Sequence, residues 1–232
     1  MGSCLYQKLL IKPYPDHQYM DKESIDWLEK NLNFLFNLND VSKYLGKLKK
    51  FPINELDINT KIYEEHNCLG IHGIRHQIRV SIYIWIIIHY YNVNIDDNEC
   101  IQLLQAALYH DLLRQNDNTD LEHGKRSAIW IKKQYPYIKE EIINSIANHD
   151  KSIDNITLYD KLIKTADALD RYRLPKEKWW INKDYLLMDI DNNILEICKY
   201  VTFMIEKRTY NLKNCDEIIK ELKICLKNLN VI

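Results

Sequence analysis

Five histidines and two aspartates lie in short segments that begin, end or interrupt the apolar stretches of this chain. Imidazole nitrogen and carboxylate oxygen form the mixed ligand set that suits a divalent ion such as Mn, Fe, Mg, Co or Zn. Helices that cross one another can bring such ligands from distant positions to one point. In chain order, the residues are His72, His76, His110, Asp111, His123, His149 and Asp167.

The adjacent pair His110 and Asp111 places a geometric condition on any such site. Neighbouring side chains on a helix diverge by about 100°. Both can therefore reach one ion only if it lies over the ridge between them, at a helix end. The pair alone is weak evidence for a metal, since an imidazolium near helix carbonyls is also favourable for purely structural reasons.

The elements that would position these residues are helices. Five Gly and five Pro in 232 residues argue against a sandwich, a barrel or a Gly-loop nucleotide fold. Apolar spacing predicts helices over 21–38, 71–91, 122–135, 138–149, 158–172, 194–207 and 215–229, and one that starts at Asp96 and ends near His110. A solvated basic stretch and a loop are expected over 43–60.

We therefore expect an all-α, multi-helix fold that forms a single domain over residues 1–232. Its core is expected over about 60–180, flanked by an N-terminal helical segment at 1–59 and a C-terminal helical pair at 185–232. One face of the helix over 71–91 carries His72, His76, Arg79 and Tyr83. Burying such groups without partners is costly, so we expect them to line a cleft or bind something.

Charge and cysteine usage exclude several classes of protein. The 32 basic and 33 acidic side chains leave a net charge of -1, which gives no strong signal for nucleic-acid binding. The six cysteines include no CxxC pair, as is typical of reduced thiols rather than a zinc ribbon. The most apolar run, 80–91, is too short to span a bilayer. We expect a cytoplasmic protein without a membrane partner.

Together, five segments resemble the HD superfamily of metal-dependent phosphohydrolases, over about residues 70–175. They are HGIRHQIRV at 72–80, AALYHDLLR at 106–114, EHGKRSA at 122–128, NHD at 148–150 and LIKTADALDRYR at 162–173. The resemblance implies an all-α fold and one metal held by His76, His110, Asp111 and Asp167. It extends to the dinuclear branch, in which Asp111 would bridge and His123 and His149 would hold a second ion.

The chemistry that this resemblance implies is attack on phosphate by a water that a divalent ion activates. For charge stabilisation we favour Lys125, which follows His123 by two residues; Arg79, Arg126, Arg171 and Arg173 are candidate substrate contacts. Each of these cations could equally be an ordinary surface charge. Glu122 or a neutral His72 are candidate general acids. Asp170 is expected to orient a ligand rather than bind metal.

The leading hypothesis is a phosphohydrolase or phosphodiesterase that acts on a nucleotide or nucleotide-like phosphate with one or two divalent ions. Some nucleotidases of the family have an acidic residue where this chain has Arg114, which argues against a simple nucleoside monophosphatase. Two alternatives stay open: a di-iron oxygenase with the same six ligands, and a nucleotide-binding regulatory module without turnover. Trp179 and Trp180 could stack a base or pack on the core. The expected partner is a small phosphate compound, with a homodimer left open.

Overall fold

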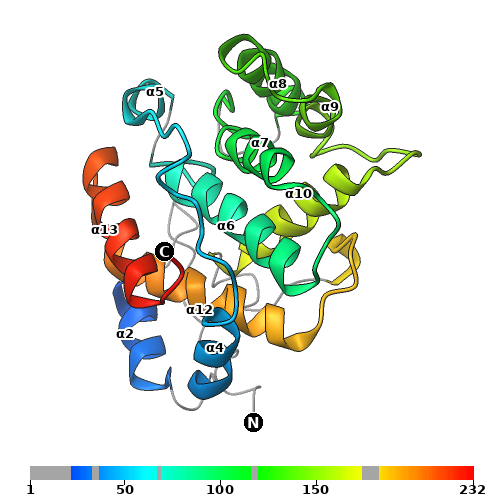
Figure 1. Ribbon diagram of the computed structural model, residues 1–232. Coiled ribbons are helices and arrows are strands. Elements are labelled where there is room, and N and C mark those ends of the chain that lie inside the picture. The colour runs from blue at the N-terminus through cyan, green and yellow to red at the C-terminus, as the bar shows by residue number, and fades with distance from the viewer. Residues whose placement is uncertain (1–21, 33–36, 67–68, 116–119, 174–182) are drawn as a thin grey trace.

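The computed structural model describes residues 22–32, 37–66, 69–115, 120–173 and 183–232, and all regular structure in these ranges is helical (Figure 1). The helices are α2 (Lys22–Lys30), α4 (Leu38–Leu45), α5 (Thr60–Glu65), α6 (Ile74–Tyr90), α7 (Asp97–Ala107), α8 (His123–Gln134), α9 (Glu140–Ala147), α10 (Leu158–Leu169), α12 (Asn192–Thr209) and α13 (Cys215–Asn228). Two short 3₁₀ helices, η1 (Asp170–Arg173) and η2 (Lys183–Tyr185), accompany them. The all-α prediction is confirmed.

Helix α6 lies at the centre of the molecule (Figure 1). Every residue from Ile74 to Ile88 is buried, as the apolar second half of its sequence predicts. It packs against α7 on one side and against α10 and α12 on others. No helix in the described ranges is long and apolar enough to cross a bilayer. Because Ile74 to Ile88 are all buried, each polar residue in this stretch of α6 needs a partner.

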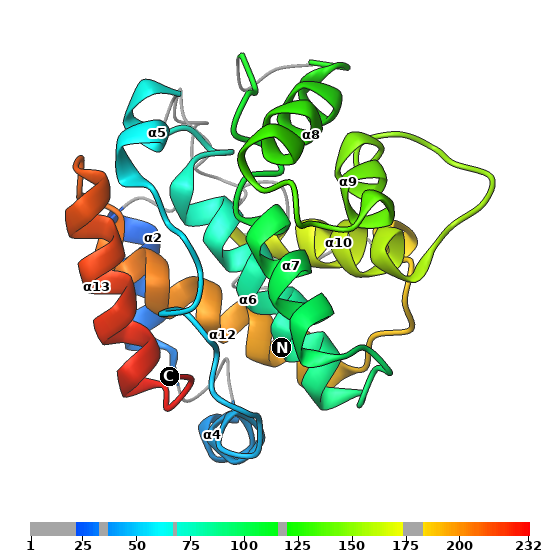
Figure 2. The ribbon, with the colours of Figure 1, turned by 45° about the horizontal axis from the view of Figure 1, so that its top comes forward.

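Helices α7 to α10 form the part of the molecule that carries the histidine segments. In Figure 2, α8 and α9 lie side by side above α7 and α10, and α9 also packs on both of these helices. The sequence determines several of the helix starts. The Asp96 side chain accepts a hydrogen bond from the amide of Glu99 at the start of α7, and Thr157 with Asp160 forms a capping box at α10.

The remaining helices cover the opposite side of α6. Helix α12 packs against α13, α2, α4 and η1, and α13 also contacts α5. The helices predicted over 194–207 and 215–229 correspond to α12 and α13. Arg75 of α6 donates to the carbonyls of Thr209 and Leu212, which anchors the turn between these two helices on the central one.

The structure corrects two predictions near the N-terminus. The helix expected over 21–38 is shorter, because α2 ends at Lys30 and Asn37 caps a separate helix, α4, that begins at Leu38. The expected loop over 43–60 is also shorter, because α4 continues to Leu45 and α5 begins at Thr60. Helix α4 forms because Val41 and Leu45, four residues apart, are both buried. Asn59 caps α5 by accepting from the amide of Ile62. Residues 1–21, and Trp179 and Trp180, lie outside the described ranges.

Candidate metal centre

The candidate ligands come from three helices and from the turns that follow two others, α7 and α9. His76 lies on α6 and Asp167 on α10, while His123 is the first residue of α8. Helix α7 ends at Ala107 and continues in tight turns, in which the amide of His110 bonds to the Ala107 carbonyl at 3.4 Å. His110 and Asp111 therefore lie just beyond a helix end, which is where an adjacent pair can converge on one point.

Four histidines are oriented in the same way, with Nδ1 against an oxygen of the protein and Nε2 toward the centre. The Nδ1 partners are Asp170 Oδ2 for His76 (2.7 Å), the Ala107 carbonyl for His110 (2.8 Å), the Asp120 carbonyl for His123 and the Ile146 carbonyl for His149 (2.7 Å). An oxygen at Nδ1 selects the tautomer with hydrogen on that atom. The Nε2 lone pair is then available to an ion, as is usual in metal-binding histidines.

Within the described ranges, two of these Nε2 atoms are buried without a hydrogen-bond partner. Nε2 of His76 and Nε2 of His110 accept no hydrogen bond, and Nε2 of His76 lies 3.3 Å from Asp167 Oδ1. Ligand atoms of His76, His110 and Asp167 all lie within 4.8 Å of one another. An unsatisfied buried polar atom costs about 1–3 kcal/mol, so a cluster of them fits a cation that the protein itself does not supply. These three residues are the first ligand group.

Asp111 joins this group to a second one. Its Oδ2 lies 3.4 Å from His76 Nε2, whereas its Oδ1 lies 2.9 Å from His123 Nε2 and 3.2 Å from His149 Nε2. His123 and His149 form the second ligand group. One buried carboxylate thus presents a separate oxygen to each group, which is the arrangement that a bridging ligand between two ions requires.

The electrostatics of the cluster favour a cation. Burial lowers the pKa of His110 to about 3, so its imidazole is neutral and ready to bind metal. Burial opposes ionisation of Asp111 as well, but His110 and the hydrogen-bonded histidines hold the pKa of its carboxyl well below the usual value. At His149, burial is outweighed by the Asp111 carboxylate, which raises the histidine pKa to about 9. A metal binding to this nitrogen would release a proton.

His72 also reaches the centre. Its Nδ1 lies 2.6 Å from Asp111 Oδ2, and ligand atoms of His72, His76 and Asp111 lie within 4.8 Å of one another. Burial lowers the pKa of this imidazole. The structure therefore brings the candidate general acid to the centre, where it contacts the Asp111 carboxylate directly.

Asp170 orients His76, as expected, and is itself held by arginines. It is fully buried and accepts from Arg79 Nε at 2.5 Å, and Arg79 also forms an ion pair with Glu206 of α12. Arg173 donates to the carbonyls of Asp170 and Ile71, at 3.0 and 2.9 Å. Neither Arg79 nor Arg173 lines the cavity next to the centre. Both arginines stabilise buried groups, and the substrate contacts expected of them are corrected accordingly.

Three other expected contacts also lie elsewhere. Lys125 and Glu122 are exposed and do not line the cavity. Lys125 follows His123 by two residues on α8, which turns it about 200° away from the ligand. Arg126 donates to the Leu113 carbonyl and to Asp120. Because the Asp120 carbonyl accepts from His123, Arg126 supports the segment that orients this ligand.

A cavity of about 890 Å³ opens beside the centre. Asp111, Asp167 and three of the histidines lie on its wall together with four cations, namely Arg114, Lys151, Lys164 and Arg171. Of these, only Arg171 was among the predicted contacts. Lys164 precedes Asp167 by three residues on a helix, so its place on the same face could have been inferred from spacing. Tyr185 also lines the cavity, and Arg171 lies 4.6 Å from the centre of its ring.

The comparison with protein families agrees with this geometry. Residues 73–172 match the family model of the HD domain. Residues 73–172 form an HD domain. The match includes all six proposed ligands, and HD domains are typical of metal-dependent phosphohydrolases. No curated protein and no solved structure gave a significant match to the chain.

Gly124 of the HD domain allows α8 to approach the end of α9 closely. A Cβ at this position would lie 2.9 Å from the Ile146 carbonyl oxygen and 3.0 Å from His149 Nδ1. We expect Gly124→Ala to displace His149 and to lower the free energy of unfolding by about 1–3 kcal/mol. Urea unfolding followed by circular dichroism checks the stability. Lys125→Ala, at the exposed neighbouring position, is the control, and equal midpoints for the two variants would contradict the expectation.

Proposed function

We propose that this protein is a metal-dependent phosphohydrolase that cleaves a phosphate ester of a nucleotide or nucleotide-like compound. The observation that carries the proposal is the placement of Asp111 on the cavity wall, with one oxygen toward each ligand group. The first ion would be held by His76, His110, Asp111 and Asp167, and a second by Asp111, His123 and His149. Divalent ions held there would supply an activated water and polarise the phosphoryl oxygen.

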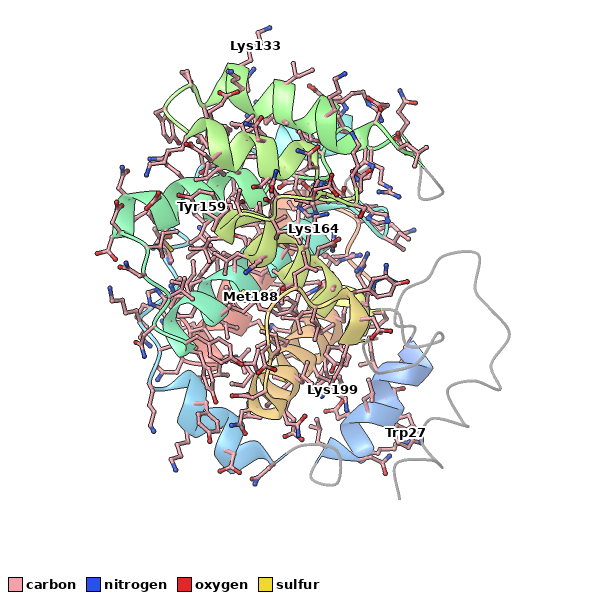
Figure 3. The ribbon with its side chains drawn as sticks, turned by 90° about the vertical axis from the view of Figure 1, so that its right-hand side faces the viewer. Trp27, Lys133, Tyr159, Lys164, Met188 and Lys199 are labelled. Carbon is pink, nitrogen blue, oxygen red and sulfur yellow. The ribbon has the colours of Figure 1, made fainter. Side chains whose placement is uncertain are left out.

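The cations of the cavity would bind the phosphate. Lys164 lies on the side of the molecule that faces the viewer in Figure 3, one helical turn before Asp167. Its ammonium donates to the Lys151 carbonyl, and burial lowers its pKa. Lys151 and Arg171 come from different segments of the same wall. A phosphate near Asp167 would thus meet positive charge from several directions, which stabilises the charge that develops during hydrolysis.

Exposed apolar and aromatic side chains in the lining of the cavity favour a substrate with an apolar or aromatic part. Tyr185, Ile156 and Leu121 are 52%, 41% and 70% exposed, and all three line the cavity. The Tyr185 ring already stacks against the Arg171 guanidinium. A planar base can use the same kind of contact, since aromatic rings stack on bases of any sequence. The presence of both cations and an exposed aromatic ring in the lining supports a nucleotide over a simple phosphate.

Hydrolysis assays test the proposal. Protein loaded with Mn should cleave bis(p-nitrophenyl) phosphate or p-nitrophenyl phosphate, and then members of a nucleotide panel. Loss of all activity on chelation and its return with Mn would support the proposal. Bound iron with oxygen consumption and no hydrolysis would instead favour the di-iron oxygenase, and nucleotide binding without turnover would favour the regulatory module.

Lys164→Ala should lower kcat/KM on the best substrate by about 10- to 100-fold, the effect of losing a charge-assisted hydrogen bond of roughly 1.5–3 kcal/mol. Lys161→Ala is the matched control, because Lys161 is exposed on the same helix and does not line the cavity. Steady-state kinetics at saturating Mn provide the measurement. Equal kcat/KM values for the two variants would remove Lys164 from the phosphate site.

A further inference from the structure

The guanidinium of Arg114 lies against the second ligand group. Its NH1 atom is 3.1 Å from His123 Nε2 and 3.8 Å from Asp111 Oδ1. These two atoms are the ones that would bind the second ion. The side chain is 15% exposed and lines the cavity, so it reaches the ligands from the substrate side.

The first ligand group has a different environment. Nε2 of His76 and Nε2 of His110 have no hydrogen-bond partner among the described residues. A cation that binds there would supply the missing partner of these two nitrogen atoms, and it would displace no described side chain. In the second group, by contrast, Asp111 Oδ1 and His123 already share a positively charged neighbour. The two halves of the centre therefore differ in how readily they accept an ion.

An arginine cannot give way by losing its proton, because guanidinium stays charged throughout the accessible pH range. A divalent ion next to the guanidinium brings two positive charges close to its one positive charge, and the two groups repel each other. At about 4 Å, even in a water-like dielectric, this repulsion corresponds to about a thirtyfold loss of affinity. Binding of a second ion is therefore coupled to movement of Arg114 away from His123.

We propose that Arg114 and the second divalent ion compete for His123 and for Oδ1 of Asp111. The first group then fills at low metal concentration, and the second fills only when Arg114 moves away. The Arg114 side chain can move into the adjacent cavity that it lines. In that position its guanidinium could bind the phosphate of a substrate. This inference rests on the metal centre proposed above but not on phosphate hydrolysis, and its tests measure metal binding alone.

Titration of chelator-treated protein with Mn, followed by isothermal calorimetry and by electron paramagnetic resonance of unbound Mn, tests the competition. Wild-type protein should bind a first ion at least tenfold more tightly than a second. Arg114→Gln should tighten the second step by about tenfold or more and leave the first within about twofold. A second step that stays within twofold of wild type would overturn the proposal.

Two further variants locate the effect. Arg208→Gln removes the same charge from α12, where Arg208 pairs with Glu221 far from the ligands in sequence, and should leave both binding steps unchanged. If Arg208→Gln also increased the affinity for the second ion, net charge and not Arg114 would control the second binding step. Adding His123→Ala to Arg114→Gln should abolish the increase in affinity for the second ion. A gain that persists would place the extra ion outside the second ligand group and refute the competition.

A measurement on the unmodified chain does not depend on how the variants fold. Phenylglyoxal reacts with accessible arginines, and peptide mass spectrometry can report the rate at Arg114. The rate should rise when Mn is raised from a concentration that fills one site to one that fills both, while the rate at Arg208 stays constant. An Arg114 rate that is constant or falls across the second step would contradict displacement of its side chain.

Discussion

Replacing Asp111 by asparagine is expected to abolish metal-dependent turnover and to weaken binding at both ligand groups. One oxygen of this carboxylate faces His76 and the other faces His123 and His149, so a single substitution affects both halves of the centre. The loss should exceed the roughly 10- to 100-fold typical of groups that only orient a ligand. Mn titration by calorimetry and assays of phosphoester cleavage measure the two effects.

Asp120→Asn is a useful comparison for Asp111→Asn. Asp120 also lines the cavity, but its side chain bonds to Arg126 and to the Gln115 amide, and it reaches His123 through its backbone carbonyl. This variant should keep the first binding step close to wild type. Circular dichroism at 222 nm should show native helicity in both variants. Wild-type affinity for two ions in the Asp111 variant would contradict the bridging role of this residue.

Arg79→Met should destabilise the protein by about 3–5 kcal/mol, because the substitution removes the arginine that pairs with the buried Glu206 and leaves the buried Asp170 with Arg173 as its remaining arginine partner. Asp170 and Glu206 are 0% and 2% exposed, and Arg79 pairs with both. Urea unfolding followed by circular dichroism gives the change directly. Metal affinity should fall as well, since Asp170 orients His76.

Arg208→Met is the matched control for Arg79→Met. Its ion pair with Glu221 has about one third of each side chain exposed. Exposed pairs contribute only about 0–1 kcal/mol, so this variant should unfold close to wild type. Equal unfolding free energies for the two variants would show that the Arg79 ion pairs do not stabilise the core. That result would also restore Arg79 as a candidate for a role in binding.

Much of the fold could be predicted from the sequence, because the relevant signals are local. Helices α6 to α10 and α12 to α13 follow the spacing of apolar residues, and Asp96 marks the start of α7 where its side chain caps the helix. The six proposed ligands could be selected by residue type and by resemblance to a family. The turn after α7 then meets the geometric condition that the adjacent pair His110 and Asp111 imposes.

Apart from Lys164, whose spacing from Asp167 indicates its face, the direction of the basic side chains could not be predicted. Arg79 and Arg171 both lie in the motifs, but Arg79 is drawn into the core by Glu206, which is distant in sequence, whereas Arg171 lies on the cavity wall. Of the four polar residues predicted on one face of the helix over 71–91, only His72, which precedes α6, lines this cavity, while the Tyr83 hydroxyl donates to the Cys198 carbonyl in the core. Such partners depend on helix packing, which apolar spacing does not specify.

The most direct test of the central claim is the metal content of protein purified without added metal, measured together with cleavage of bis(p-nitrophenyl) phosphate. We predict at least one divalent ion per chain after reconstitution with Mn and hydrolysis that is lost on chelation, and for the Asp111→Asn variant weaker metal binding and no hydrolysis. Protein that folds but binds no divalent ion under any reconstitution, and hydrolyses no phosphate ester, would contradict the account.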